Sequence, residues 1–237
     1  MSAARLILGI STSGPVEVAA LDDSDRAVVV CPRGQALESL LVGVEQVLDE
    51  FHASLDDIGL IAVCIGPGSF TSLRIGVAFA KSLAQARSLP VLGIAAYDVA
   101  EFDIQQFPRI AVAAGKRNYY YGRVTIHAAA APEFIQGDKA LVQQAAERLA
   151  DASGHPATIA GTDFSTFAPG ERARRVAQLG RRARAAGRAS GWRDIVIDYG
   201  QRPNAVINWE RRGARAQEGQ AFERRELSAD EGPAAPA

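Results

Sequence analysis

The stretch IGPGSFTSLRIG at residues 65–76 decides the fold of this chain. An apolar run, Leu60–Cys64, precedes it and is typical of a buried strand, and a second apolar run, Val77–Ala84, follows it and is typical of a helix. The order predicts a strand, a glycine turn and a helix N-terminus in direct succession. A turn of this kind can hold a phosphate, or it can position a helix that packs against something else.

The glycines of the turn leave both alternatives open. Gly66 and Gly68 can adopt positive φ or let another backbone approach closely, and Pro67 cannot continue a strand ladder. Ser69 or Thr71 can cap the helix, whose free N–H groups and dipole favour an anion. The stretch has no Gly-Lys-Ser/Thr ending, however, and Thr71 stands where a G-x-G-x-x-G loop needs its last glycine.

The helix after the turn carries small residues four positions apart. Gly76, Ala80 and Ala84 share one face, and a glycine inside a helix costs about 1 kcal/mol relative to alanine. Close approach of a second element would offset that cost. The spacing allows that element to belong to another protein or to the same domain.

Two larger side chains at the start of this helix are candidate contacts. Arg74 places a cation in the first turn, where the helix dipole disfavours it without an anionic partner. That partner is either Asp56 or Asp57 of this chain or an anionic group on a bound molecule. Phe70 is either a core residue or an interface anchor.

Composition excludes some classes of protein. The chain has 237 residues, 48% of them hydrophobic, and a net charge of −1, which gives no overall attraction to nucleic acid. Residues 1–110 carry 13 acidic and 7 basic side chains and residues 111–237 carry 14 and 19, with most of the basic excess between Arg172 and Arg193. No apolar run is long enough to span a membrane, and two cysteines form no disulfide framework, so we expect a soluble, cytoplasmic protein in which Cys31 and Cys64 are buried free thiols.

Hydrophobic periodicity predicts an α/β protein of two similar lobes. The first lobe, residues 1–100, reads β-β-β-α-β-α-β; the second, residues 101–212, reads as a weaker copy; and residues 213–237 read as a disordered tail. We expect strands at Arg5–Ile10, Val16–Leu21, Ala27–Cys31, Leu60–Cys64, Val91–Ile94, Arg109–Ala114, Tyr119–Ile126 and Ala157–Gly161. We expect further helices at Leu37–Phe51, Lys139–Ala150 and Glu171–Arg188.

This order of elements is similar to the actin-like ATPase (ASKHA, RNase H-like) fold, in which each of two lobes has a mixed β-sheet flanked by helices. Within that fold, the stretch Gly66–Gly76 resembles the signature of the TsaB (YeaZ) family. The Leu8–Ser13 opening and Cys31-Pro32-Arg33 match the same family. Ser11 departs from it, because relatives usually have an acidic residue there.

The resemblance implies a non-catalytic scaffold or dimerisation subunit without a cofactor or metal of its own. Such a subunit binds a TsaD-type catalytic paralogue and a TsaE-type P-loop ATPase, which carry the ATP and metal, for N6-threonylcarbamoylation of adenosine 37 in tRNAs that read ANN codons. The same helices can form a homodimer, contact with tRNA is indirect or weak, and no membrane is involved. The alternative function is a small actin-like kinase or ATPase that uses the Gly66–Gly68 turn for phosphate.

The resemblance also assigns residues to roles. It implies no catalytic residue and no metal ligand. The partner-binding residues it implies are Ser69, Phe70, Thr71, Leu73, Arg74, Gly76, Val77, Ala80 and Ala84. The residues it implies for the turn and a vestigial phosphate loop are Ser11, Thr12, Ser13, Gly66, Pro67 and Gly68.

Overall fold

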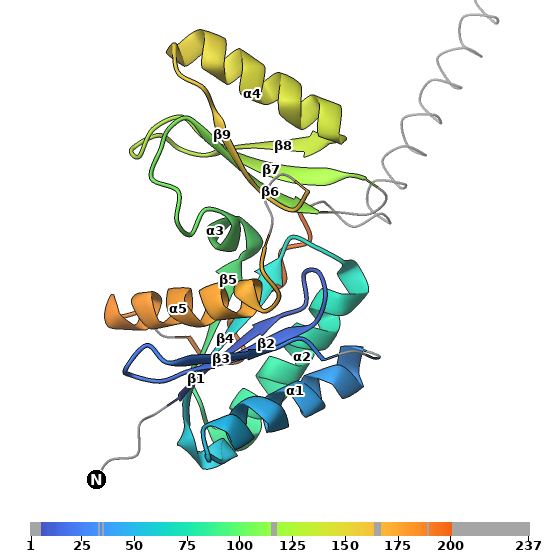
Figure 1. The fold of residues 1–237 in the computed structure, drawn as a ribbon, viewed down its shortest axis with the longest axis vertical. Helices are drawn as coiled ribbons and strands as arrows, with labels where there is room; N and C mark the ends of the chain where they lie inside the picture. The colour runs from blue at the N-terminus through green and yellow to red at the C-terminus, as the bar shows by residue number, and fades with distance from the viewer. Residues whose placement is uncertain are drawn as a thin grey trace, which may run out of the picture. The chain divides into compact units, whose positions relative to one another are not determined.

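A computed structural model describes residues 6–32, 34, 36–114, 118–163, 167–188 and 190–200 (Figure 1). Residues 1–200 form one compact unit. The predicted tail at residues 213–237, and the part of the predicted second lobe after residue 200, lie outside the described residues.

The first sheet has five strands in the order β3-β2-β1-β4-β5. Its strands are β1 (Leu6–Ser11), β2 (Glu17–Leu21), β3 (Ala27–Val30), β4 (Ile58–Gly66) and β5 (Val91–Ala95). β1, β2 and β3 form the predicted antiparallel meander, while β4 runs parallel to both β1 and β5. Parallel neighbours need crossover helices, and α1 (Ala36–Glu50) and α2 (Phe70–Arg87) supply them.

Helices cover both faces of this sheet (Figure 1). α1 and α2 pack on one face, where Leu40, Val44 and Val47 of α1 are buried against strand residues such as Ile10 and Val63. The opposite face is covered by α5 (Glu171–Ala185). A sheet covered on both sides explains why β4 reads as a continuous apolar run.

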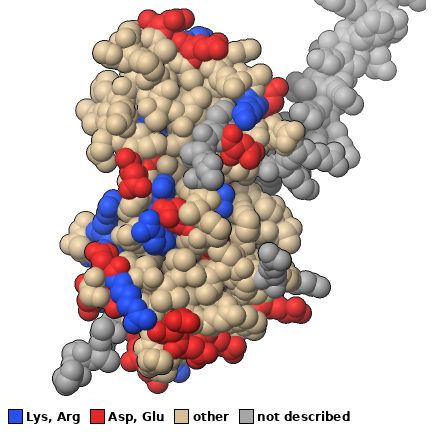
Figure 2. Space-filling view, viewed as in Figure 1, with Lys and Arg blue, Asp and Glu red and all other residues tan. Residues whose placement is uncertain are grey.

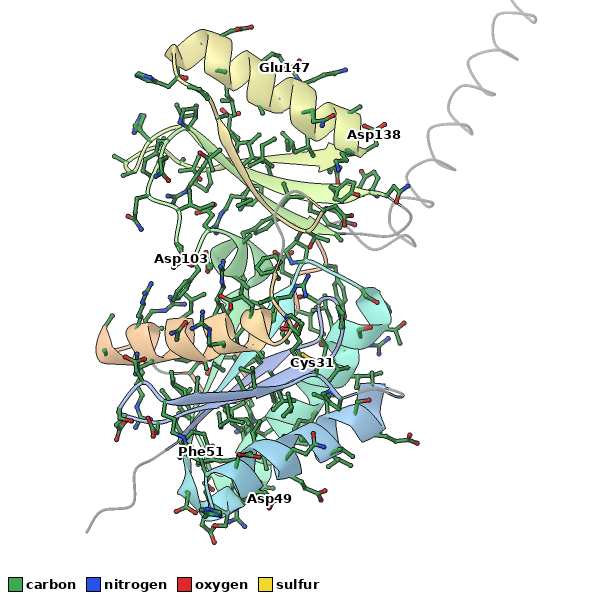
Figure 3. All side chains as sticks on the ribbon, viewed as in Figure 1. Cys31, Asp49, Phe51, Asp103, Asp138 and Glu147 are labelled. Carbon is green, nitrogen blue, oxygen red and sulfur yellow. The ribbon has the colours of Figure 1, made fainter. Side chains whose placement is uncertain are left out.

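The second sheet has four strands in the order β8-β7-β6-β9. Its strands are β6 (Arg109–Ala114), β7 (Tyr120–Thr125), β8 (Glu133–Gly137) and β9 (Thr158–Gly161), and its helix is α4 (Lys139–Ser153). The carboxylate of Asp138, labelled in Figure 3, caps α4 by accepting from the Leu141 N–H at 2.9 Å. β6 pairs with β7 antiparallel and with β9 parallel, so this sheet repeats part of the first one.

Two short elements, α3 and β8, have no clear pattern in the sequence. α3 (Ala96–Ala100) has five residues, which is too few to show a helical period. β8 is mostly exposed and carries charged and polar residues, because it lies at the edge of the second sheet.

Helix α5 follows the second sheet in the sequence but packs on the first. The buried carboxylate of Glu17 on β2 accepts from the backbone N–H groups of Arg172 and Ala173, at 2.9 and 3.2 Å, and from the Arg172 guanidinium at 3.0 Å. Gly170 precedes the helix and has no capping side chain. Glu17 therefore caps α5 from a strand more than 150 residues earlier in the chain.

Candidate functional site

The glycine turn is filled by backbone of the same chain. Gly66 has φ +106°, and a Cβ there would lie 2.2 Å from the Asp198 carbonyl oxygen. A Cβ at Gly68 would lie 3.1 Å from Ser13. The Asp198 N–H also donates to the Ile65 carbonyl at 2.8 Å, so residues 190–200 run directly over the turn. Close approach of Asp198 and Ser13 accounts for these glycines.

The predicted vestigial loop at Ser11–Ser13 is largely buried. Ser11 and Thr12 are 0% exposed, and the Ser11 and Ser13 hydroxyls lie 3.3 Å apart. The Thr12 Oγ1 has no hydrogen-bond partner among the described residues. A Cβ at Gly76 would lie 2.3 Å from that same oxygen, so the missing side chain of Gly76 allows α2 to cross the end of β1.

Five of the predicted partner-binding residues face the protein's own core. The small residues bring α2 close to β1 and β4 of the same domain, so these side chains are buried within the chain itself. This burial is the intramolecular alternative that the spacing allowed. The residues concerned are Leu73, Gly76, Val77, Ala80 and Ala84.

The other four, Ser69, Phe70, Thr71 and Arg74, are exposed at the start of α2. Ser69 is the N-cap residue, but its side chain makes no capping bond and accepts instead from the Ser72 hydroxyl at 3.1 Å. Phe70, Thr71 and Arg74 line an open, mostly apolar groove of about 620 Å³ together with Leu37 of α1. Phe70 and Leu37 are 53% and 55% exposed, so large apolar side chains from two helices meet at this surface.

Part of this surface, which we call the α1–α2 surface, is not apparent from the hydrophobic pattern of the sequence. Leu41 lies one turn beyond Leu37 on α1 and is 53% exposed, and the neighbouring Val42 is 44% exposed. The expected helix at Leu37–Phe51 carries many apolar residues. The number of apolar residues in this helix indicates that some of them are exposed. Apolar residues stand at 37, 40, 41, 42, 44, 47 and 48, and together they cover more than one face of a helix.

Arg74 and Phe70 contact each other at the start of α2. The Arg74 guanidinium lies 5.2 Å from the centre of the Phe70 ring, and Tyr199 stacks on that ring at 4.8 Å. Of the two kinds of partner considered for Arg74, the one within this chain is not found: the described residues show no ion pair from Arg74 to Asp56 or Asp57. Asp56 pairs with Arg87, and Asp57 instead accepts hydrogen bonds from Ser54.

The arginines of α5 are largely engaged within the protein. Arg174 and Arg175 bind Glu171 at 3.0 and 2.8 Å, and Arg175 also pairs with Asp103, which Figure 3 labels. Arg181 pairs with Asp25 on the turn before β3. In Figure 2 basic and acidic side chains accordingly alternate over this region. The α5 arginines therefore do not form a free basic stripe for phosphates.

No three His, Cys, Asp or Glu side chains among the described residues lie together as a metal site requires. No helix that the structure describes is long and apolar enough to cross a membrane. Cys64 is buried as expected, and burial raises the pKa of its thiol. Cys31 is exposed, because β3 ends at Val30, so its predicted burial is wrong.

Comparison with known proteins shows which proteins this chain is similar to. The model of the family "TsaD: tRNA N6-adenosine threonylcarbamoyltransferase" matches residues 34–187. A transferase of that name from Thermodesulfovibrio yellowstonii is 50% identical over 50 residues, which cover 21% of this chain and 15% of the relative. The tRNA threonylcarbamoyladenosine biosynthesis protein TsaB of Escherichia coli is 40% identical over 65 residues, which cover 27% and 28%. The chain thus matches less than a third of the length of either relative.

The structural match extends further than the sequence matches. YeaZ from Pseudomonas aeruginosa superposes with a TM-score of 0.62 at 21% identity, over 82% of this chain and 99% of that one. The similarity confirms the expected two-lobed, actin-like α/β fold and the resemblance read from the Gly66–Gly76 signature. The chain belongs to the family of tRNA N6-adenosine threonylcarbamoyltransferases, TsaD, and has the fold of the YeaZ proteins.

Proposed function

We propose that this chain acts in the N6-threonylcarbamoylation of adenosine 37 in tRNA, as a subunit that binds a TsaD-type catalytic protein through the α1–α2 surface. Family membership and the local similarity to TsaB support the pathway. The observation that carries the mode of action is the exposed apolar groove between Leu37 and Phe70. Contiguous apolar surface of this kind marks a protein interaction site more often than a solvated face.

The chemistry of the glycine turn supports a binding role over a catalytic one. Actin-like kinases use carboxylates near the phosphate to hold a metal ion and to accept a proton. Here the Ser11–Ser13 loop offers hydroxyls only, and the Asp198 carbonyl and Ser13 take up the space beside Gly66 and Gly68. We therefore propose that ATP, metal and the transfer step belong to the partner proteins, a TsaD-type transferase and a TsaE-type P-loop ATPase, with the α1–α2 surface also available for a homodimer.

The composition of the α1–α2 surface indicates how a partner would bind. Tyr199 stacks on the Phe70 ring and the Arg74 guanidinium lies 5.2 Å from its centre, so contacts within this chain restrict the ring before any partner binds. An ordered aromatic anchor loses little side-chain entropy on binding, and aromatic and arginine side chains supply much of the energy of protein interfaces. Leu41 extends the apolar area along α1.

The experiment is measurement of N6-threonylcarbamoyladenosine in total tRNA from cells depleted of this chain. We expect the modified nucleoside to fall on depletion and to return with the wild-type chain. The Leu41→Glu variant should fail to restore it, whereas Ile126→Glu, at a position 41% exposed directly after β7 of the second sheet, should restore it. An unchanged nucleoside level on depletion would refute the pathway. Threonylcarbamoyl transfer by the purified chain alone would refute the scaffold role.

A further inference from the structure

A second hollow lies away from the α1–α2 surface and is lined by aromatic rings. It has a volume of about 380 Å³, and Tyr97 of α3, Tyr121 of β7 and Phe134 of β8 form much of its wall. The Tyr97 and Phe134 rings lie 5.8 Å apart and are tilted by 55°, so they do not cover each other by stacking. Gly200 closes another side, because its missing side chain lets the backbone lie against the Tyr121 ring.

One carboxylate lines the same hollow. The Asp198 backbone is fixed by its bond to Ile65, and its Oδ1 accepts from the Gly200 N–H at 2.8 Å. Among the described residues no Lys, Arg or His pairs with Asp198. The nearby arginines are already engaged, since Arg123 binds Asp98 at 2.8 Å and Glu101 at 3.3 Å.

Among the described residues around the hollow, Asp198 is a carboxylate without a basic partner, and the Arg123 guanidinium lies 5.3 Å from the centre of the Tyr97 ring. Arg109 shares Glu101 with Arg123, at 2.8 Å, so these two arginines offset the carboxylates of α3 and its C-cap. The negative charge of Asp198 is not offset by either of these arginines. Burial is the main cause that raises the pKa of both Tyr97 and Tyr121; the Asp198 carboxylate adds to the rise at both, Tyr119 adds to it at Tyr121, and Arg123 opposes it at Tyr97.

We propose that this hollow binds a small organic cation, an alkylammonium or a guanidinium, between the three rings and the Asp198 carboxylate. Aromatic faces attract cations through their quadrupole, and quaternary ammonium groups bind in cages of this composition. A carboxylate at the wall adds a direct charge interaction, which strengthens where the rings exclude water. The volume lies within the range of small-molecule pockets. The proposal is independent of the proposed function, because it involves neither α1 nor α2.

The test is calorimetric titration of the full chain with choline, which carries a charge but no N–H donor, and with agmatine, which carries a guanidinium. The matched neutral probe is 3,3-dimethylbutan-1-ol, the uncharged isostere of choline. Asp198→Asn removes the charge and keeps an oxygen to accept from Gly200. Phe134→Leu removes one ring at a position that is 65% exposed, so folding is preserved. Asp23→Asn, an exposed carboxylate on the β2–β3 turn, is the control.

We expect choline or agmatine to bind and the neutral alcohol not to bind. Asp198→Asn should weaken binding about tenfold, and Phe134→Leu about two- to fivefold. Asp23→Asn should bind as the wild type does. The proposal is overturned if neither cation binds at millimolar concentration, if the alcohol binds as tightly as choline, or if Asp198→Asn leaves the affinity unchanged while its melting temperature matches that of the wild type.

Discussion

The ion pair between Glu17 and the start of α5 gives a sharp prediction about what holds α5 to the first sheet. Glu17 is 2% exposed and accepts three hydrogen bonds from Arg172 and Ala173. Glu17→Gln keeps one acceptor oxygen but removes the negative charge, so the Arg172 guanidinium, with 19% of its side chain exposed, loses its counter-ion. Hydrogen bonds to charged groups contribute about 1.5–3 kcal/mol, and a carboxylate at a helix N-terminus about 0.3–1 kcal/mol.

The expected loss is therefore about 2–4 kcal/mol of unfolding free energy. For a chain of this size that loss lowers the melting temperature by roughly 4–16 °C. The assay is urea and thermal unfolding followed by circular dichroism. Glu45→Gln, the same change at an exposed position of α1, is the control and should shift stability by no more than about 0.5 kcal/mol. If Glu17→Gln is as stable as Glu45→Gln, the cross-chain cap does not secure α5 and this reasoning fails.

Three further changes test other parts of the account. Ala80→Glu buries an unpaired charge at a 0% exposed site and should destabilise by more than about 3 kcal/mol, whereas Ala78→Glu, exposed on the same helix, should change unfolding in urea little. Gly9→Ala would place a Cβ 2.4 Å from the Ala173 carbonyl oxygen and should cost about 1–3 kcal/mol in the same assay; a neutral result would mean that α5 lies farther from β1. Burial tends to raise the pKa of Glu171, but hydrogen bonds from its two arginine neighbours outweigh burial and lower the pKa from the ordinary 4.5. Ionised Glu171 therefore stabilises the folded state fully above the ordinary pKa, and this stabilisation is lost as the pH falls through the lowered folded-state pKa. The difference in melting temperature between the wild type and Glu171→Gln should shrink between pH 7 and about pH 3. A constant difference would contradict this.

The order of elements in the first lobe followed from the sequence because its signals are local. Alternating and continuous apolar runs set the strands, and short turns joined β1, β2 and β3. The helix between β4 and β5 required those strands to run parallel, which they do. Short or exposed elements such as α3 and β8 gave no such signal.

The parts that could not be predicted depend on contacts between distant segments. The pattern of α5 shows an amphipathic helix but not which sheet it covers, and that choice is made by Glu17 on β2. The small residues of α2 suit a partner helix and the protein's own sheet equally, so spacing could not decide between them. Tyr199 reaches Phe70 only because residues 190–200 return over the glycine turn.

The affinity of this chain for the TsaD-type protein encoded in the same genome tests the central claim most directly. Leu41 is more than half exposed, so Leu41→Glu leaves the core intact while placing a charge on the α1–α2 surface. We expect that variant to bind at least about tenfold more weakly than the wild type by calorimetry, because a charge in a dry apolar interface loses its hydration. Ile126→Glu, an exposed position directly after β7 of the second sheet, should bind as the wild type does. Equal affinity of wild type and Leu41→Glu would contradict the assignment of the α1–α2 surface as the docking site.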